Sequence, residues 1–386
     1  MRTTTASLSA FAAFGLFWGM WGAALPALRS ASDLDDAALG TALLFVGLGA
    51  LPAMFFTGRL VDRFGSRIAG PLLITLAVAG VLTAFFAHNL LTLIVGMTLV
   101  GATSGAADVA SNALAGLAEQ KSGRRIITIA HAVFSSFVVI GSLGTGALRT
   151  AGTDVGFVFV VMGALMIALG VVVLVLGGGP HRIDSASGQS RTPSWRYAVP
   201  FVIVGLIAAL GFAAENAHQS WSAIFLADEL SAEPGLTALA PATFAAFAAV
   251  TRFAAGALTR LRAPFLLIGG GVTATAGTLL VGSATNTMTA LGGLALAAIG
   301  TSVLFPTLLS EATRTVPTHR RGRATSAVAT TAYLGFVLGP VFVGFLAEAV
   351  GLRGAMIGIA ALTAAFAVIA PNVAGRHSFL ERSQRS

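Results

Sequence analysis

Apolar stretches of roughly 20 residues, separated by short polar breaks, run through the whole chain. Twelve can be delimited, at approximately 8–28, 37–57, 68–87, 90–117, 126–148, 155–176, 197–226, 237–258, 265–284, 287–311, 324–349 and 354–374. About 20 apolar residues in helical conformation cross a hydrocarbon core of about 30 Å. Lipid offers no water to open strand edges, so each stretch is predicted to be a helix and the fold an all-α membrane protein. The break between the third and fourth stretches consists only of His88 and Asn89.

One long polar segment interrupts this pattern at 177–196, GGGPHRIDSASGQSRTPSWR, and it is rich in Gly, Ser and Pro. This composition is typical of a flexible linker. It predicts an N-terminal six-helix half at 1–176, a cytoplasmic linker at 177–196 and a C-terminal six-helix half at 197–386.

The two halves also repeat short motifs at corresponding positions. Gly58, after the second stretch, has a counterpart in Gly256 after the eighth, and Gly123-Arg124 matches Gly322-Arg323. Repetition of this kind predicts two parallel, pseudo-symmetric halves. In the second copy, Arg260 replaces the aspartate of the first.

Composition excludes several classes of protein. Of the 386 residues 56% are hydrophobic and 10% charged, and the mean hydropathy is +0.87, whereas about a quarter of a soluble domain is charged. Cysteine is absent, so a disulfide or a thiolate site cannot form. We find neither a phosphate-binding loop nor His/Glu metal spacing, and expect no enzyme, ATP-driven pump, metal or cofactor.

The distribution of charge predicts the orientation in the membrane. The net charge is +8, but the basic residues are dispersed between the apolar stretches, which argues against nucleic acid as a partner. Connections from odd to even stretches carry only Arg29, Arg149 and Arg353 among the 23 Lys and Arg. Positive residues favour the cytoplasmic side, so both termini are predicted to be cytoplasmic.

Charged and polar groups within the apolar stretches are candidates for function, because each charge is costly at a helix centre. In the fourth stretch Ser104, Asp108 and Asn112 form a polar stripe at i, i+4 and i+8, which we expect to face a cavity. The alternative is an aspartate that hydrogen-bonds to neighbouring helices and only holds them together.

The seventh stretch carries the densest polar cluster in any stretch: Glu215, Asn216, His218, Gln219, Trp221 and Ser222. An aromatic ring beside amides and a hydroxyl is typical of a site for a polar small molecule with an apolar face. The alternative, strongest for His218 and Trp221, is a polar and aromatic belt at the membrane interface. Arg252 and Glu311 are expected to be charges near the ends of their stretches.

The first and tenth stretches add further candidates for substrate contact, namely Trp18, Trp21 and Thr307. Pro306, next to Thr307, has no backbone N–H and is expected to loosen its helix, freeing carbonyls towards a cavity.

The loop after the second stretch reads Gly58-Arg-Leu-Val-Asp62-Arg63-Phe-Gly65-Ser-Arg67. Gly58 is expected to let the helix end pack closely on a neighbour, and Gly65 to occupy a turn with positive φ. Asp62 is placed to pair with a guanidinium or to lie at the positive end of a helix.

This pattern, Gly-x-x-x-Asp-Arg-x-Gly-x-Arg, resembles the signature loop of the major facilitator superfamily (MFS). The resemblance implies the MFS fold of twelve helices and transport by alternating access. It also implies that Gly58, Asp62, Arg63, Gly65 and Arg67 form a latch that stabilises the outward-open arrangement. A polytopic receptor or assembly factor that transports nothing remains the alternative of another class.

Four shorter segments resemble a bacterial MFS branch related to fucose permease: Asp108-Val-Ala-Ser-Asn112, His131-Ala-Val-Phe-Ser135, Glu215-Asn-Ala with Trp221-Ser-Ala, and Gly339-Pro with Gly344-Phe-Leu-Ala-Glu348. In that branch an acidic residue at the place of Asp108 takes part in proton coupling. Two departures weaken a drug/proton antiporter assignment: Met97 stands near the place of an arginine common in proton-coupled members, and the Gly-rich motif at 141–146 lacks its proline.

The sequence therefore predicts a monomeric secondary transporter of the bacterial cytoplasmic membrane, with lipid, protons and a small molecule as partners. Uptake of a sugar-like solute is favoured, and efflux of a drug or metabolite by proton antiport is the alternative. Asp108 and Glu215 are the expected coupling pair, because burial disfavours a charged carboxylate and so promotes uptake of a proton.

Overall fold

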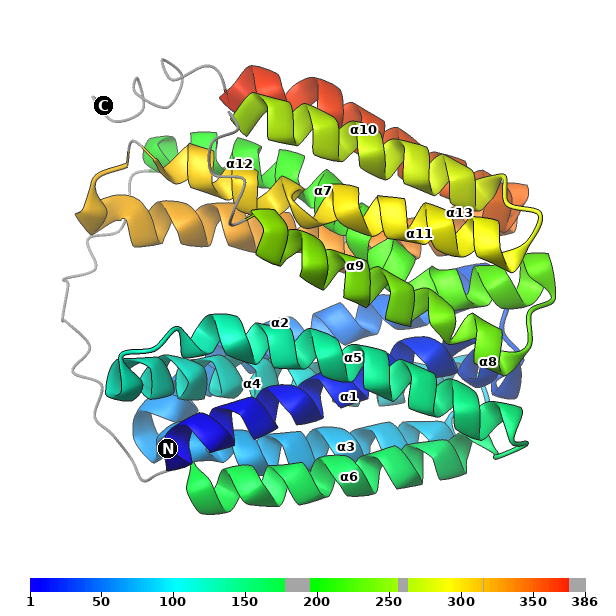
Figure 1. The fold of residues 1–386 in the computed structure, drawn as a ribbon, viewed down its shortest axis with the longest axis horizontal. Helices are drawn as coiled ribbons and strands as arrows, with labels where there is room; N and C mark the ends of the chain where they lie inside the picture. Colours follow the sequence, from blue (N-terminus) through cyan, green and yellow to red (C-terminus); the bar gives the residue numbers. More distant parts are fainter. Residues whose placement is uncertain (178–194, 256–262, 315, 375–386) are drawn as a thin grey trace. The chain divides into compact units, whose positions relative to one another are not determined.

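The computed structural model describes residues 1–177, 195–255, 263–314 and 316–374, and these residues contain helices and turns but no strand. Figure 1 labels the helices. They are α1 (Arg2–Ala31), α2 (Asp36–Phe64), the 3-10 helix η1 (Ser66–Ile68), α3 (Ala69–Phe86), α4 (Leu90–Ser122), α5 (Ile126–Thr150), α6 (Val155–Leu176), α7 (Trp195–Leu230), α8 (Pro234–Thr237), α9 (Leu239–Ala255), α10 (Ala263–Gly282), α11 (Thr287–Ser302), α12 (Leu304–Thr313) and α13 (Thr318–Ala374).

These helices form the predicted twelve spans. Eleven helical segments in the described residues are long and apolar enough to cross a membrane, among them Pro234–Ala254 from α8 and α9 and Thr287–Thr313 from α11 and α12. The last, Arg323–Asn372, has 50 residues and contains Gly351, whose φ of 78° and ψ of 162° are not helical. It is therefore two spans in succession, divided within the gap that the sequence predicted between 349 and 354.

Polar residues between the apolar stretches cap the helices. The side chain of Asn89 accepts a hydrogen bond from the backbone N–H of Thr92 at 3.0 Å, and the Thr92 hydroxyl accepts one from the N–H of Asn89 at 3.2 Å. This reciprocal pair satisfies N–H groups that a helix start leaves free. The weakly marked boundary between the third and fourth spans is thereby confirmed.

Pro306 loosens its helix as predicted. The tenth span is broken at Val303, between the end of α11 at Ser302 and the start of α12 at Leu304. Proline lacks the N–H that would bond to the carbonyl of Ser302, so the regular ladder cannot continue through this turn.

The chain packs as two compact units, each of which we describe by itself. Unit 1 comprises Met1–Ser187 and Ala223–Ala246, and unit 2 comprises Gly188–Ser222 and Phe247–Ser386. Unit 1 thus holds α1–α6 with the end of α7, α8 and the start of α9. Most of the predicted linker, 178–194, lies outside the described residues, as do Gly256 and Arg260 of the repeated loop.

Close helix packing in both units depends on glycine. In unit 1, α1 lies beside α5 and α3 beside α6 (Figure 1). A Cβ atom on Gly19 of α1 would lie 2.0 Å from the carbonyl oxygen of Val138 in α5, and one on Gly335 of α13 would lie 1.9 Å from that of Ala209 in α7. Small residues let helices approach in lipid, where burial of apolar surface adds little to their association.

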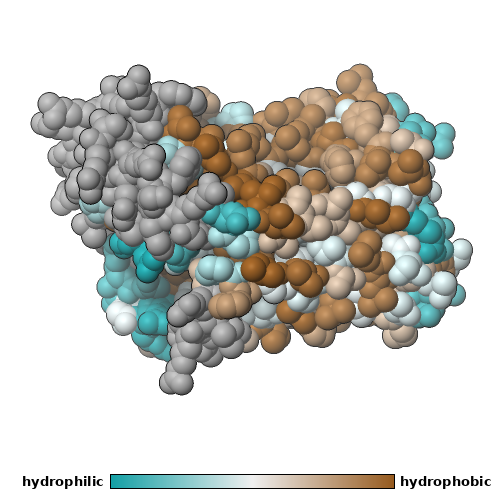
Figure 2. Space-filling model, turned by 90° about the horizontal axis from the view of Figure 1, so that it is seen from above, coloured by the Kyte–Doolittle hydropathy of each residue, from teal (hydrophilic) through white to brown (hydrophobic). Residues whose placement is uncertain are grey.

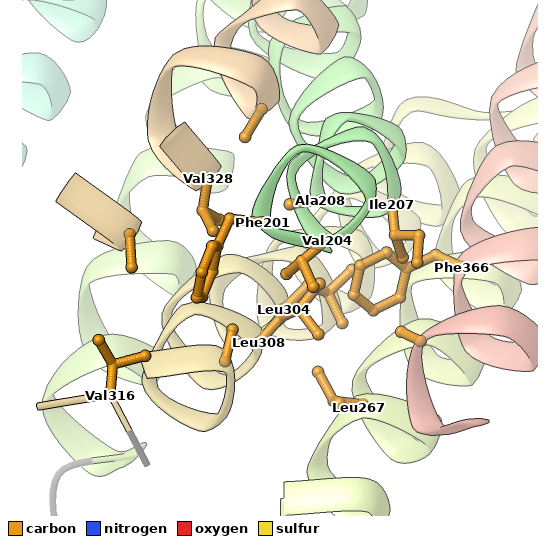
Figure 3. Packing of buried hydrophobic residues seen from close by; sticks show 14 residues of the cluster. Phe201, Val204, Ile207, Ala208, Leu267, Leu304, Leu308, Val316, Val328 and Phe366 are labelled. Atoms are coloured by element: carbon orange, nitrogen blue, oxygen red, sulfur yellow. The ribbon is translucent and has the colours of Figure 1, made fainter. Parts of the chain in front are cut away.

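The interior of unit 2 is an apolar cluster built from four helices (Figure 3). Its labelled members are Phe201, Val204, Ile207 and Ala208 of α7, Leu267 of α10, Leu304 and Leu308 of α12, Val316, and Val328 and Phe366 of α13. Phe201, Leu267 and Phe366 are at most 1% exposed. This packing fixes the rotation of α7, which carries the polar cluster.

The outside of the protein is also apolar. Figure 2 shows hydrophobic side chains over much of the described part of one face. Leu91 of α4 and Val175 of α6 are 71% and 72% exposed. Such a surface is unfavourable in water but suits contact with lipid tails.

Candidate functional site

In unit 1, the predicted polar stripe of α4 lies on one helix face. Asp108 is half-buried, and the amide of Asn112 donates to its Oδ1 at 2.9 Å and to its backbone carbonyl at 2.9 Å. Ser104 is buried one turn before it. The hydrogen-bond partner of the Asp108 carboxylate is therefore a neutral amide of its own helix.

The two tryptophans of α1 lie in different surroundings. Trp21 is 2% exposed, stacks on Phe17 with ring centroids 5.6 Å apart, and meets Phe159 of α6 edge-on at 6.2 Å. Trp18 is half-buried and touches Phe14 and Phe17 with its edges. Trp21 thus contributes to the packing of α1 on α6, while Trp18 keeps an accessible face.

In unit 2, an ion pair joins two helices. Glu215 of α7 is buried, and its Oε1 accepts hydrogen bonds from Nη2 of Arg252 in α9 at 2.6 Å and from the amide of Gln219 at 3.3 Å. Arg252 lies in the last turn of α9, near a helix end as expected, and there it is the partner of Glu215. The sequence contained a hint, since a lone arginine in an apolar span needs a counter-charge.

Polar and aromatic groups of α7, α12 and α13 also contact one another in unit 2. The amide of Asn216 donates to the carbonyl of Phe336 in α13 and accepts from Ser220 at 3.5 Å. Phe212 of α7 stacks on Phe305 of α12 at 4.5 Å, and Tyr333 stacks on Phe336 at 5.1 Å. Thr307, in α12, is half-buried.

The other polar residues of the α7 cluster belong to the interior. His218 is fully buried and its Nε2 lies 2.9 Å from the hydroxyl of Thr278 in α10. The Trp221 indole N–H donates to the carbonyl of Pro340 at 3.1 Å, and the Ser222 hydroxyl donates to the carbonyl of His218. Full burial places His218 and Trp221 away from a lipid interface, where a belt residue would lie.

Most of the predicted loop after the second span is helical, because Gly58 to Phe64 form the last turns of α2 and the helix ends at Gly65. Gly65 has a φ of 78°, so its expected positive φ is confirmed. The expected close packing at Gly58 is wrong, because nothing lies within 4 Å of a Cβ atom built there. Asp62 is exposed, and the guanidinium of Arg63 lies over the ring of Phe64, 5.2 Å from its centroid. Arg67, in η1, is also exposed.

The three arginines that the sequence placed on the side with few basic residues all form hydrogen bonds or ion pairs. In unit 1, Arg29 contacts the Leu34 carbonyl at 3.1 Å, Oδ1 of Asp36 at 2.9 Å and the carboxylate of Asp228 near the end of α7. Arg149 donates to the Thr153 carbonyl at 2.8 Å. Arg353 donates to the carbonyls of residues 282 and 284. These bonds explain why arginine is tolerated there against the general charge bias.

The family model described as Major Facilitator Superfamily matches residues 7–332 and 201–382. The chain belongs to this superfamily. It is 30% identical over 372 residues to the uncharacterized transporter y4wD of Sinorhizobium fredii, covering 92% of this chain and 94% of that protein. It is 26% identical over 363 residues to the membrane protein MosC of Rhizobium meliloti, covering 93% and 87% of the two chains.

Solved MFS structures share the fold. A bacterial homolog of the human lysosomal transporter Spinster, inward-facing and unoccupied, matches with a TM-score of 0.77 at 18% identity, over 96% of each chain. A D-xylose-proton symporter matches with a TM-score of 0.76 at 14% identity, over 97% of this chain and 96% of the other. The chain is thus a multi-pass membrane protein and an MFS secondary transporter.

Proposed function

We propose that this MFS member takes up a small polar solute across the bacterial cytoplasmic membrane together with protons, and that Asp108 carries the proton. The halves 1–176 and 197–386, joined by the linker and with both termini cytoplasmic, alternate in access around the solute. The observation that carries the proposal is a half-buried carboxylate within α4 whose hydrogen-bond partner is a neutral amide. Such a group can gain and lose a proton without breaking an ion pair.

Glu215 is the weaker candidate for the proton site. Its Oε1 accepts from a guanidinium and an amide, so this carboxylate is already engaged in an ion pair between two helices. We assign Glu215 to the solute site instead, with Asn216, Gln219 and Thr307 in unit 2. In unit 1 we assign Asn112 and the accessible face of Trp18 to solute contact, and leave Trp21, His218, Trp221 and Ser222 to packing.

The latch remains part of the proposal. Asp62, with Arg63, Arg67 and the turn at Gly65, would hold the cytoplasmic ends together when the transporter is open to the outside. In the present conformation Asp62 is exposed, which leaves it accessible to a partner in another conformation.

The test is transport by Asp108→Asn in proteoliposomes. The solute is first found by a thermal-shift screen of sugars, nucleosides, peptides and antibiotics, because a ligand of the folded state raises its stability. Asp108→Asn should abolish accumulation driven by a pH gradient while exchange of labelled solute continues. Asp33→Asn is the matched control, because Asp33 is exposed and its φ of 50° suits asparagine.

Accumulation by Asp108→Asn at the wild-type level would overturn the assignment of the proton to Asp108. If the screen identifies an antibiotic, and an inward proton gradient drives its extrusion, the proposal of uptake would be replaced by one of proton antiport.

A further inference from the structure

The two partners of the ion pair between Glu215 and Arg252 differ in their exposure. The carboxylate side chain is 12% exposed, whereas the arginine side chain is 46% exposed. A molecule that reaches this pair in unit 2 therefore meets the guanidinium and not the carboxylate. A cation would find the negative group already covered and neutralised.

Arg252 lies on the face of α9 whose other side chains are packed against the protein. Phe244 and Ala248, at four-residue intervals before Arg252, are 1% and 4% exposed. The outward side of the same helix is marked by Phe247 and Val250, which are 42% and 66% exposed. Residues four apart lie on one helix face. Arg252 thus extends from the inward face of α9, and 46% of its side chain is exposed.

The bonded geometry leaves donors available. Within the described residues Glu215 engages Nη2 of the guanidinium, and a guanidinium carries five N–H donors in a planar fork. Nη2 shares one edge of the fork with Nε and the other with Nη1, so a single bond from Nη2 to Glu215 leaves one two-donor edge, which matches two oxygens of a carboxylate. Gln219, exposed and one turn from Glu215, adds an amide beside it.

We propose that Arg252 recognises a carboxylate on the transported solute, with Glu215 as the positioning residue that orients the guanidinium. This inference rests on the proposed function, since it adds a charge requirement to the polar solute of that proposal. Glu215 lowers the cost of keeping an arginine within a span and leaves one donor edge free for the solute.

The first experiment measures the local charge without knowing the solute. The natural chain has no cysteine, so Gln219→Cys introduces a single thiol next to the pair. We measure how fast this thiol reacts with two reagents, the anionic sulfonatoethyl and the cationic trimethylammonioethyl methanethiosulfonate. Each rate is divided by the rate of the same reagent with a free thiol in solution, which gives a corrected rate. We expect the corrected rate to be at least about fivefold higher for the anionic reagent, because the exposed guanidinium lies nearer to the reagent than the covered carboxylate.

The preference for the anionic reagent should vanish when both charges of the pair are removed together. Glu215→Gln with Arg252→Gln removes both charges and avoids leaving an unpaired carboxylate in the interior. Glu311→Gln with Arg314→Gln is the matched control, because these two residues also form an ion pair, at 3.2 Å near the end of α12. An unreactive thiol, or rates without an anionic preference, would overturn the proposal.

The second experiment tests whether the site prefers carboxylates, by comparing each carboxylate with a neutral molecule of similar shape. Glucuronate, lactate and benzoate are compared with glucose, lactamide and benzamide as protectants of the Gln219→Cys thiol. Slower modification with at least one carboxylate, and not with its neutral counterpart, supports the proposal. Equal protection by a neutral partner, or none by any carboxylate, contradicts it. Both readouts are independent of proton coupling, so they can fail while the Asp108 test succeeds, and the reverse.

Discussion

Polar side chains within the spans differ in how they satisfy their hydrogen bonds. His218 and Trp221 reach partners on neighbouring helices, at Thr278 and Pro340, and are fully buried. Asp108 and Gln219 bond to residues of their own helix and keep an open side. A buried polar group without a partner is costly, so full burial combined with a partner on another helix marks a residue that holds the fold.

Thr278→Val tests the structural role of His218. The substitution keeps the shape of the side chain but removes the hydroxyl next to the buried imidazole, so unfolding should become easier by about 0.5–2 kcal/mol. The Michaelis constant for the solute should not change. Thr103→Val is the control, because the Thr103 hydroxyl bonds to carbonyls of its own helix. A raised Michaelis constant at unchanged melting temperature would instead place His218 in the solute site.

Helix pairs in both units approach so closely that a methyl group would collide with a backbone carbonyl. At Gly335 the collision would be with Ala209, on α7, the helix that also carries Glu215. The contact between α7 and α13 therefore helps to set the position of the solute site, and crowding it should displace both helices.

Gly335→Ala should destabilise the protein by about 1–3 kcal/mol, because an added methyl in a packed contact forces the backbone to shift. Gly292→Ala is the matched control in unit 2, since nothing lies within 4 Å of a Cβ atom there. Melting temperatures in detergent give the comparison. Equal values for the two variants would mean that α7 and α13 are not in close contact in the membrane protein.

Across the whole chain, opposite ends of the spans carry different charge clusters. At one end Arg29 ties the end of α1 to Asp36 of α2 and to Asp228 of α7, all in unit 1. Also in unit 1, the Ser142 hydroxyl of α5 donates to the carbonyl of Ala238 at 2.6 Å. At the other end, Asp62 is exposed. Separation of the two sequence halves at this end would have to break the contact of Arg29 with Asp228 and the bond of Ser142 to Ala238.

Removal of charge at the two ends should have opposite effects on the conformational equilibrium. Arg29→Gln should favour opening at its own end, because the contact with Asp228 is lost. Asp62→Asn should favour opening at the opposite end, because the variant lacks the charge of the proposed latch. Spin-label pairs at each end, on single-cysteine backgrounds, measure the distances. Shifts in the same direction for both variants would show that neither group acts as a latch.

Much of the fold was predictable from sequence because its determinants are local. Helical spans follow from the length of the apolar stretches, since every backbone group in lipid must bond within its own helix. The cap at Asn89, the positive φ of Gly65 and the break before Pro306 also depend on residues a few positions apart. The motif at 58–67 could indicate the family from sequence because its residues are consecutive in the chain.

The candidate site was predictable only as a set of residues. Which of them are accessible depends on the rotation of each helix and on its neighbours, and a helical repeat leaves both undetermined. The tertiary structure therefore decided that His218 is packed against Thr278, that Gly58 has no close neighbour, and that Arg252 pairs with Glu215 from 37 positions away. The energies of burial and ion pairing depend on which atoms are neighbours in the tertiary structure. A sequence pattern indicates only the helix face on which a residue lies.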